Sequence, residues 1–214
     1  MMKQHETDEV VVRRRPRLMG PAAQARALAE ATARLASRRQ RDALPLRIET
    51  PRLVLRAPIR GDVPDLVRLA DNRAIASKLS RLPSPYTRAD GIGFVEIVAQ
   101  RPDERPYAIV LNDGFIGIVG FSFHTGEPPE LGYWLGEPHW GKGIMSEAAR
   151  ALLEAAFATR LFPLLRARAL KTNLGSRKVL EKAGFVLVRE DVEAIGDRAG
   201  EETVHYRLEA PKWR

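Results

Sequence analysis

Apolar residues alternate with polar ones or recur at helical spacing along most of the chain after residue 48, and the two patterns are interleaved. Alternation predicts strands over residues 52–58, 107–111, 115–123, 130–136, 166–172, 185–191 and 203–208. Asn112-Asp113-Gly114 predicts a tight hairpin turn, and a long polar loop joins the last two strands. Interleaved strands and helices indicate a mixed α/β fold with a mostly antiparallel central sheet and flanking helices.

Several residues mark where the helices begin and end. Asp62, followed by Pro64, is expected to cap one helix, and Thr87 with Asp90 predicts the start of another, with its body over 92–100. Further helices are predicted from Ile144 to before Pro163 and over 176–183, the latter ending at Gly184. The helix after Ile144 connects strands 130–136 and 166–173, which predicts a parallel βαβ unit.

The most informative segment is the strand, glycine turn and helix over residues 130–150. Glycines at 141 and 143 leave backbone N–H groups open toward an anion, and the helix start adds free donors and the positive end of its dipole. A P-loop is disfavoured because residue 143 is Gly where Ser or Thr would hold magnesium. A dinucleotide fingerprint is disfavoured because Ser146 replaces its third glycine. A phosphate or pyrophosphate site of another kind is therefore predicted.

Two blocks of sequence resemble a known family. The segment LGYWLGEPHWGKGIMSEAARALL resembles motif A of the GNAT superfamily of N-acetyltransferases, in its RimJ/RimL-type branch. Trp140 and Met145 stand where the superfamily usually has Gln or Arg and Gly or Ala, as is common in that branch. The segment KTNLGSRKVLEKAGF, Lys171–Phe185, resembles motif B. The similarity extends over most of residues 48–214.

The resemblance implies a single domain over residues 48–214 that transfers the acetyl group of acetyl-CoA directly to a primary amine, either a protein N-terminus or a small molecule. In such proteins the parallel strands splay apart, and the pantetheine arm pairs with their free backbone groups. The residues that it implies for binding the cosubstrate are Tyr133, Trp134, Leu135, Trp140, Gly141, Lys142, Gly143, Ile144, Met145, Ser146, Asn173, Arg177 and Lys178. For each of the three basic side chains, a solvated surface position is the alternative.

The catalytic residues that the resemblance implies are Glu130 as general base and Ser176 as acid for the leaving thiolate. The alternative for Glu130 is a solvated residue at a strand start, and His124 is a second candidate base. Leu180 occupies the position of the tyrosine that many relatives use as acid. The alternative for Ser176 is a helix N-cap, and we expect it to serve both roles.

The composition of the chain indicates what class of protein it is, where it is located and whether it binds a metal. With 44% hydrophobic and 29% charged residues, the 214-residue chain is typical of a globular domain. It has no cysteine, no apolar run long enough to span a bilayer and no signal-peptide pattern, so a cytoplasmic location is expected. Its four histidines lack metal-ligand spacing, so no metal is expected.

The positive charge is concentrated before the domain. Residues 1–47 carry 11 Lys or Arg and 5 Asp or Glu, which accounts for +6 of the net charge of +8. Residues 1–20 are expected to be disordered, and residues 22–40 to form a helix. This extension either contacts RNA, the ribosome or an acidic membrane surface, or packs on its own domain or a partner subunit. We favour packing because aromatic residues are absent. A non-catalytic acyl-CoA-binding or ribosome-associated module is the alternative function, and both monomer and homodimer remain open.

Overall fold

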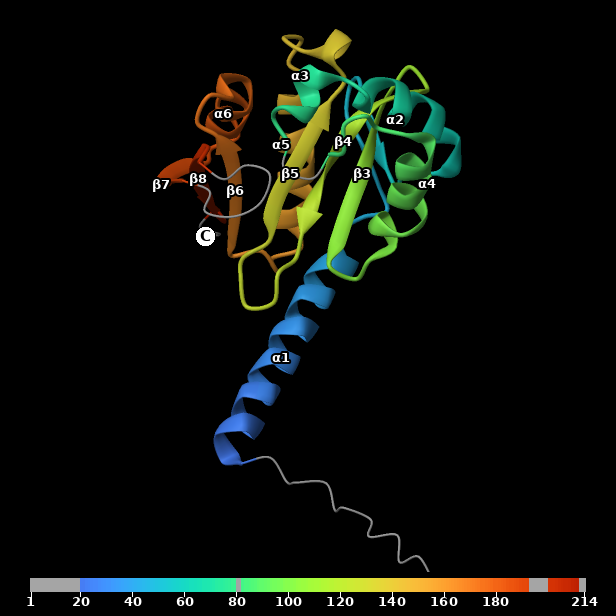
Figure 1. Cartoon of the computed structure of the whole chain (residues 1–214). Coiled ribbons are helices and arrows are strands. Elements are labelled where there is room, and N and C mark those ends of the chain that lie inside the picture. Colours follow the sequence, from blue (N-terminus) through green and yellow to red (C-terminus); the bar gives the residue numbers. More distant parts are fainter. Residues whose placement is uncertain (1–19, 80–81, 193–199, 212–214) are drawn as a thin grey trace, which may run out of the picture.

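The computed structural model describes residues 20–79, 82–192 and 200–211 (Figure 1). Its elements in chain order are α1 Pro21–Ala43, β1 Arg47–Glu49, β2 Val54–Arg56, η1 Arg60–Asp62, α2 Val63–Ala70, α3 Arg73–Ala76, α4 Arg88–Glu96, η2 Val98–Gln100, β3 Glu104–Leu111, β4 Gly114–Ser122, β5 Glu130–Leu135, η3 Glu137–His139, α5 Ile144–Ala158, β6 Leu164–Leu170, α6 Leu174–Lys182, β7 Val186–Val192 and β8 Glu202–Glu209. The predicted mixed α/β class is confirmed. The short elements β1 and α3 were not predicted.

The eight strands form one sheet in the order β1-β2-β3-β4-β5-β6-β8-β7. Neighbouring strands are antiparallel except β5 and β6. The predicted hairpin is present between β3 and β4, where Asn112 and Asp113 have φ of 48° and 64°. Two consecutive residues at positive φ match the turn whose twist suits a hairpin, which Asn-Asp-Gly permits.

The parallel pair β5 and β6 stays together for only a short distance. Their register contains two residue pairs, Glu130 with Arg166 and Leu131 with Ala167. Beyond Leu131 the strands separate, and α5 crosses from the end of β5 to the start of β6 (Figure 1). The expected splayed pair is therefore present, with its opening at the carboxyl end of β5.

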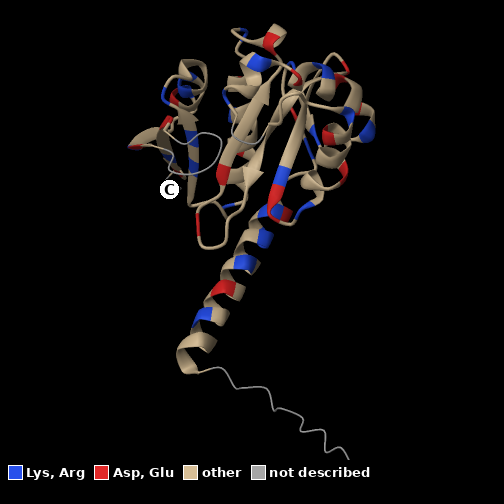
Figure 2. Cartoon of the chain, viewed as in Figure 1, with Lys and Arg blue, Asp and Glu red and all other residues tan. Residues whose placement is uncertain are grey.

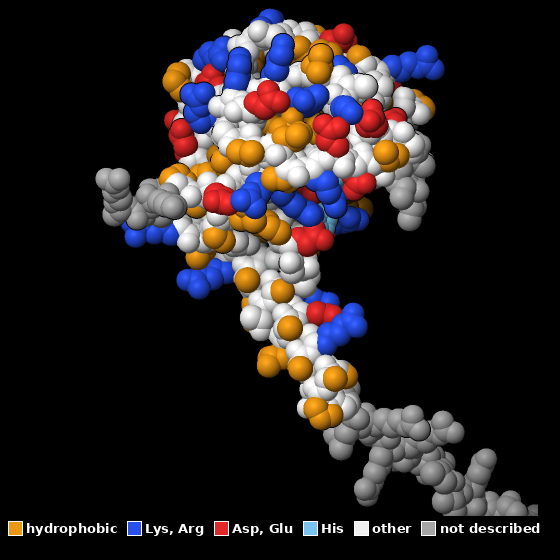
Figure 3. Space-filling view, turned by 90° about the vertical axis from the view of Figure 1, so that its left-hand side faces the viewer, with side chains coloured by type: hydrophobic (Ala, Val, Ile, Leu, Met, Phe, Trp, Pro, Cys, Tyr) orange, Lys and Arg blue, Asp and Glu red, His pale blue; other side chains and the backbone are white. Residues whose placement is uncertain are grey.

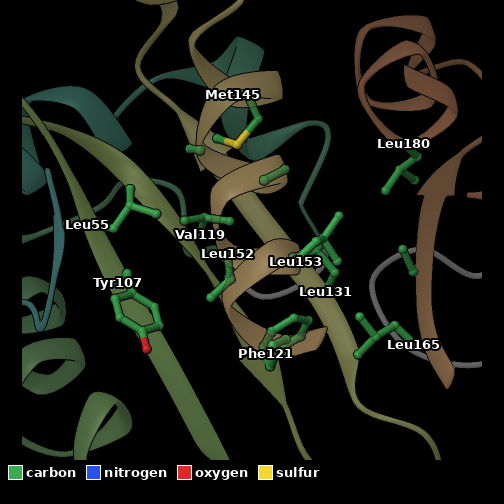
Figure 4. Packing of buried hydrophobic residues seen from close by; sticks show 14 of the residues in the cluster. Leu55, Tyr107, Val119, Phe121, Leu131, Met145, Leu152, Leu153, Leu165 and Leu180 are labelled. Atoms are coloured by element: carbon green, nitrogen blue, oxygen red, sulfur yellow. The ribbon is translucent and has the colours of Figure 1, made fainter. Parts of the chain in front are cut away.

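Helices cover both faces of the sheet because β4 presents apolar side chains to both. Val119 belongs to the larger core cluster, in which α5 contributes buried residues such as Leu152 (Figure 4). Ile118, the preceding residue, belongs to a second cluster with Leu66 of α2. Side chains of successive strand residues point to opposite faces, so α5 and α2 lie on opposite sides of the sheet. Leu152 is fully buried, consistent with close packing of α5 on the sheet.

The two predicted helix caps at Asp62 and Ser176 have different outcomes. Asp62 is the N-cap residue of α2 and Pro64 follows in the first turn, as predicted, but its side chain makes no cap hydrogen bond because its carboxylate accepts from both terminal nitrogens of Arg56, at 2.7 and 2.8 Å. Ser176 is not the N-cap of α6. That position belongs to Asn173, whose Oδ1 accepts from the Ser176 backbone N–H at 3.2 Å. By contrast, the predicted helix start at Thr87 and Asp90 is confirmed as a reciprocal capping box.

The segment before the sheet contains the long helix α1, which projects away from the rest of the chain (Figure 1). It is rich in Arg (Figure 2), and its apolar side chains are exposed, with Leu28 and Leu35 both at least two-thirds accessible (Figure 3). Its last turns contact the domain through the Gln40 amide on the Leu161 carbonyl and the Arg41 guanidinium on the Glu104 carbonyl. The predicted disorder of residues 1–20 falls, except for Gly20, outside the described residues.

Candidate active site

A cavity of ≈ 1030 Å³ runs along β5 from its first residue to the glycine turn beyond its end. One side is formed by residues of α3, α4 and η2, and the other by β6 and α6. The floor consists of residues from β4 and β5. The cavity thus includes the gap where β5 and β6 separate, which leaves backbone groups of both strands accessible to a ligand.

The glycine turn closes one end of this cavity. Gly141 and Gly143 both have left-handed backbones, with φ of 73° and 72°, and both line the cavity. A side chain at either position would be strained, so glycine is required there. The N-terminus of α5 follows directly and has no side-chain cap. Its first-turn N–H groups and its dipole therefore favour an anion at this end, which is where the sequence places a pyrophosphate.

A side-chain clamp that the sequence did not reveal holds this turn. Arg52 donates to the Lys142 carbonyl at 3.2 Å and to Glu147 Oε2 at 2.7 Å, and Thr50 donates to the other Glu147 oxygen at 2.6 Å. Burial alone would raise the pKa of Glu147, but the hydrogen bonds from Thr50 and Arg52 outweigh it and lower the pKa below its ordinary value. The clamp joins the β1–β2 connection to the turn and to the first turn of α5.

Trp140 fixes the other side of the turn. Its indole Nε1 donates to the Leu135 carbonyl at 2.6 Å, and the Lys78 ammonium lies 4.4 Å from its ring centre. Nearby, burial and the positive charges of Lys142 and Arg68 lower the pKa of His139. A neutral His139 at pH 7 leaves the positive potential here to the lysines and to the helix end.

On the opposite side of the strand gap, Tyr133 of β5 reaches the start of α6. Its hydroxyl lies 3.1 Å from the Ser176 carbonyl, to which it donates, and 3.0 Å from Ser176 Oγ. Burial raises the pKa of Tyr133 well above its ordinary value, with a smaller opposing effect from the Ser176 hydrogen bond. The phenol therefore stays protonated at neutral pH. The sequence indicated only the Tyr133 backbone; its side chain also belongs to this site.

Glu130 lies at the far end of β5 and is held by two arginines. Its Oε1 accepts from Arg168 Nε at 3.0 Å, and its Oε2 lies 3.2 Å from a terminal nitrogen of Arg166. The side chain is 14% exposed, so it is not the solvated strand-start residue considered as its alternative. His124, the second candidate base, is absent from the cavity lining.

The structure brings most of the predicted site residues to one cavity. Those that line it are Glu130, Tyr133, Trp134, Leu135, Trp140, Gly141, Gly143, Ile144, Met145, Ser146, Asn173, Ser176 and Lys178. Lys142 and Arg177 do not line it. Lys142 Nζ donates to the Pro138 carbonyl, and Arg177 donates to Tyr206 and the Lys171 carbonyl. The roles of all these residues stay predictions.

Other lining residues carried no signal in the sequence. Glu104 of β3 and Ser122 of β4 both line the cavity, and Ser122 Oγ donates to Glu104 Oε2 at 2.9 Å. They meet only because the strand register places Glu104 opposite Ser122 and Ser122 opposite Glu130. Likewise, Phe94 and Ile97 come from a helical segment whose position over the sheet could not be read from spacing.

Two further properties concern the described residues only. None of their His, Cys, Asp and Glu side chains form a group of three or more that could hold a metal ion. Within the same ranges, every helix is too short or too polar to cross a bilayer.

A mostly antiparallel sheet with one diverging parallel strand pair, beside a glycine turn that opens a helix, defines an N-acyltransferase fold of the GNAT type. A comparison with protein families agrees: the model described as Acetyltransferase (GNAT) domain matches residues 52–186. The chain belongs to this family.

Two sequence relatives illustrate which members of the family the chain is similar to. A protein named "Probable N-acetyltransferase YjcK" from Bacillus subtilis (strain 168) is 47% identical over 55 residues, 26% of this chain and 30% of that protein. The ribosomal-protein-serine acetyltransferase of Escherichia coli (strain K12) is 33% identical over 92 residues, 41% of this chain and 50% of that protein. The matches thus span half or less of these two relatives. The second one confirms the resemblance to the RimJ/RimL-type branch.

Solved structures agree on the fold. RimL, a ribosomal L7/L12 α-N-protein acetyltransferase in complex with coenzyme A, has a TM-score of 0.67 at 23% identity over 78% of this chain and 97% of that one. The spermidine N-acetyltransferase of Vibrio cholerae, in complex with CoA and spermine, has a TM-score of 0.64 at 20% identity over 75% of this chain and 97% of that one. At these identities the likeness concerns the fold alone.

Proposed function

We propose that this protein transfers the acetyl group of acetyl-CoA to a primary amine, either a protein N-terminus or a small molecule. The observation that carries the proposal is the separation of β5 from β6 after Leu131, in the same cavity as the turn of Gly141 and Gly143. The gap offers backbone partners to the amides of a pantetheine arm, and the turn offers N–H donors to a diphosphate. A cytoplasmic location, the expectation from sequence, belongs to the same proposal.

In this proposal the chain supplies three chemical groups for transfer. Glu130 accepts a proton from the attacking amine, directly or through water, as the new C–N bond forms. A backbone N–H of β5 near Tyr133 stabilises the negative charge on the carbonyl oxygen, an effect of roughly 3 kcal/mol in other enzymes. Ser176 donates its proton to the sulfur as the C–S bond breaks, and for this step the Tyr133 hydroxyl turns its one proton from the Ser176 carbonyl to Ser176 Oγ, 3.0 Å away.

The test is the release of thiol from acetyl-CoA in the presence of an amine panel. The chain has no cysteine, so a thiol reagent reports the product without background from the protein. Glu130→Gln and Ser176→Ala are each expected to lower kcat about 100-fold, a typical loss for a positioned acid or base. Glu127→Gln is the matched control, because Glu127 is also ion-paired with Arg166 but does not line the cavity.

The outcomes separate the parts of the proposal. If both variants turn over like the unmodified chain, the assigned roles are wrong while the activity stands. If calorimetry shows binding of coenzyme A but no amine supports release, a non-catalytic acyl-CoA-binding module replaces the transferase. Deleting residues 1–44 tests the basic extension: an unchanged affinity for a peptide acceptor at low and high salt would exclude a role in acceptor binding.

A further inference from the structure

Three rows of residues that cross β3, β4 and β5 form the sheet surface under the α4 and η2 side of the cavity, and all of them except Ala108 line it. Residues directly opposite one another on neighbouring strands present their side chains on the same face. The register gives a polar row, a glycine row and an apolar row, which are Glu104, Ser122 and Glu130; Pro106, Gly120 and Gly132; and Ala108, Ile118 and Trp134. The chemical character of the surface therefore changes from charged to apolar over a distance of four residues along β5.

The glycine row contains a hollow at Gly132. A Cβ added at Gly132 would meet no atom within 4 Å, so the space above it is open. At Gly120 a Cβ would lie 2.6 Å from the Arg105 carbonyl oxygen and 2.7 Å from the Pro106 Cα, which only glycine avoids. Gly132 directly follows Leu131, the last residue of β5 that pairs with β6. The hollow thus lies next to the strand gap, and an amine in it has Glu130 in the neighbouring row.

The helical wall of the same cavity is apolar. Phe94 of α4, Ile97 and Val98 line it, and Ile97 is 63% exposed although it is a large aliphatic residue. Phe94 and Trp134 pack against the same buried cluster, which places them on the same side of the sheet. An exposed aliphatic side chain at the entrance to a cavity gains from a ligand that covers it with apolar surface.

This wall has a single carboxylate that could face a second positive charge. That carboxylate belongs to Asp90, whose Oδ2 already serves as a helix cap, because it accepts from the Thr87 N–H at 2.8 Å and from the Thr87 hydroxyl at 2.5 Å. Burial raises the pKa of Tyr86 to about 12, with a further contribution from Asp90, so the phenol is uncharged. Over the whole cavity, five Lys and Arg side chains face three Asp and Glu. A polycation would meet net repulsion.

From this arrangement we infer that the acceptor is a primary monoamine with an apolar body. The amine occupies the hollow at Gly132 near Glu130, and the body lies between Ile118 and Trp134 on one side and Phe94 and Ile97 on the other. This inference rests on the proposed transferase function and specifies its substrate class. It differs from the acceptor named for the structural neighbour that acetylates spermidine, a polyamine.

The discriminating experiment compares hexylamine with 1,6-diaminohexane, which differ in whether the far end is apolar or charged. With the full-length chain and saturating acetyl-CoA, kcat/KM for thiol release is expected to be at least about tenfold higher for hexylamine, because the diamine must bring a second positive charge against an apolar wall in a cavity with more basic than acidic side chains. Phenethylamine should follow hexylamine. A diamine that performs equally well, or a Ser-Ala-Ala-Ala peptide that exceeds both monoamines, overturns the inference and leaves the transferase function intact. Release with none of these amines overturns both.

A pair of variants locates the effect in the structure. Ile97→Glu places a carboxylate on the apolar wall, so it should lower kcat/KM for hexylamine about tenfold and bring the diamine closer to it. The affinity for coenzyme A should not change. Ile59→Glu is the matched control, since Ile59 is also exposed, at 51%, but does not line the cavity. If Ile97→Glu leaves the ratio of the two amines unchanged, the body of the acceptor does not lie on this wall.

Discussion

Removing the Arg52 side chain should weaken the binding of coenzyme A without abolishing the fold. Arg52 donates to Glu147 in the first turn of α5 and to the Lys142 carbonyl in the glycine turn. In Arg52→Ala these two segments lose their shared partner, and the N–H donors at Gly141 and Gly143 become less well ordered before the ligand arrives. Binding must then order them, which costs free energy.

The size of the effect follows from the exposure of the pair. A hydrogen bond to a charged group contributes about 1.5–3 kcal/mol, and solvent reduces this for exposed partners. The Arg52 and Glu147 side chains are 46% and 20% exposed, so the lower end of the range applies. A loss of about 1.4 kcal/mol corresponds to a Kd about tenfold higher. Arg52→Lys keeps the positive charge but not the two-pronged geometry of the guanidinium. Its Kd for coenzyme A should therefore lie between those of the unmodified chain and Arg52→Ala.

Isothermal calorimetry with coenzyme A measures this directly. Arg47→Ala is the control, because Arg47 forms an exposed ion pair with Glu49 of the same strand, β1, and does not line the cavity. Thermal unfolding of each variant shows whether the domain remains folded at the assay temperature. If folded Arg52→Ala protein binds coenzyme A with a Kd within twofold of the unmodified chain, the clamp does not order the N–H donors of the diphosphate site before the ligand binds.

Three further predictions concern stability. Leu152→Ala should lower the free energy of unfolding in urea by about 3 kcal/mol, because this fully buried side chain leaves a cavity, whereas exposed Leu35→Ala should change it by less than about 0.5 kcal/mol. Asp62→Asn should cost about 3 kcal/mol in the same assay, since it leaves the Arg56 guanidinium without its anionic partner; a loss below about 1 kcal/mol would contradict this. Because the folded pKa of Glu147 is lowered, its stabilising effect is present at neutral pH and is lost as the pH falls below its ordinary value of 4.5 through the folded pKa. The difference in Tm between the unmodified chain and Glu147→Gln should therefore shrink on acidification, and a constant difference from pH 7 to pH 3 would argue against this linkage.

Local chemistry explains which sequence predictions held. The β3–β4 hairpin depends on Asn112 and Asp113, which tolerate positive φ, and the start of α4 depends on a capping box between Thr87 and Asp90. Both involve residues close in sequence. Asp62 is at the predicted N-cap position, but its side chain makes no cap hydrogen bond because a side chain six positions earlier, Arg56, takes both carboxylate oxygens. Composition and spacing contain no information on that competition.

The same division applies to the site. The glycine turn and the start of α5 could be recognised from Gly141 to Ser146, because their function depends on backbone conformation that a short stretch of sequence determines by itself. The polar row that joins Glu104 to Glu130, the clamp between Arg52 and Glu147, and the wall around Ile97 were decided only by tertiary structure. These features combine elements that are separate along the chain, and the strand register and the packing of the helices on the sheet bring them together.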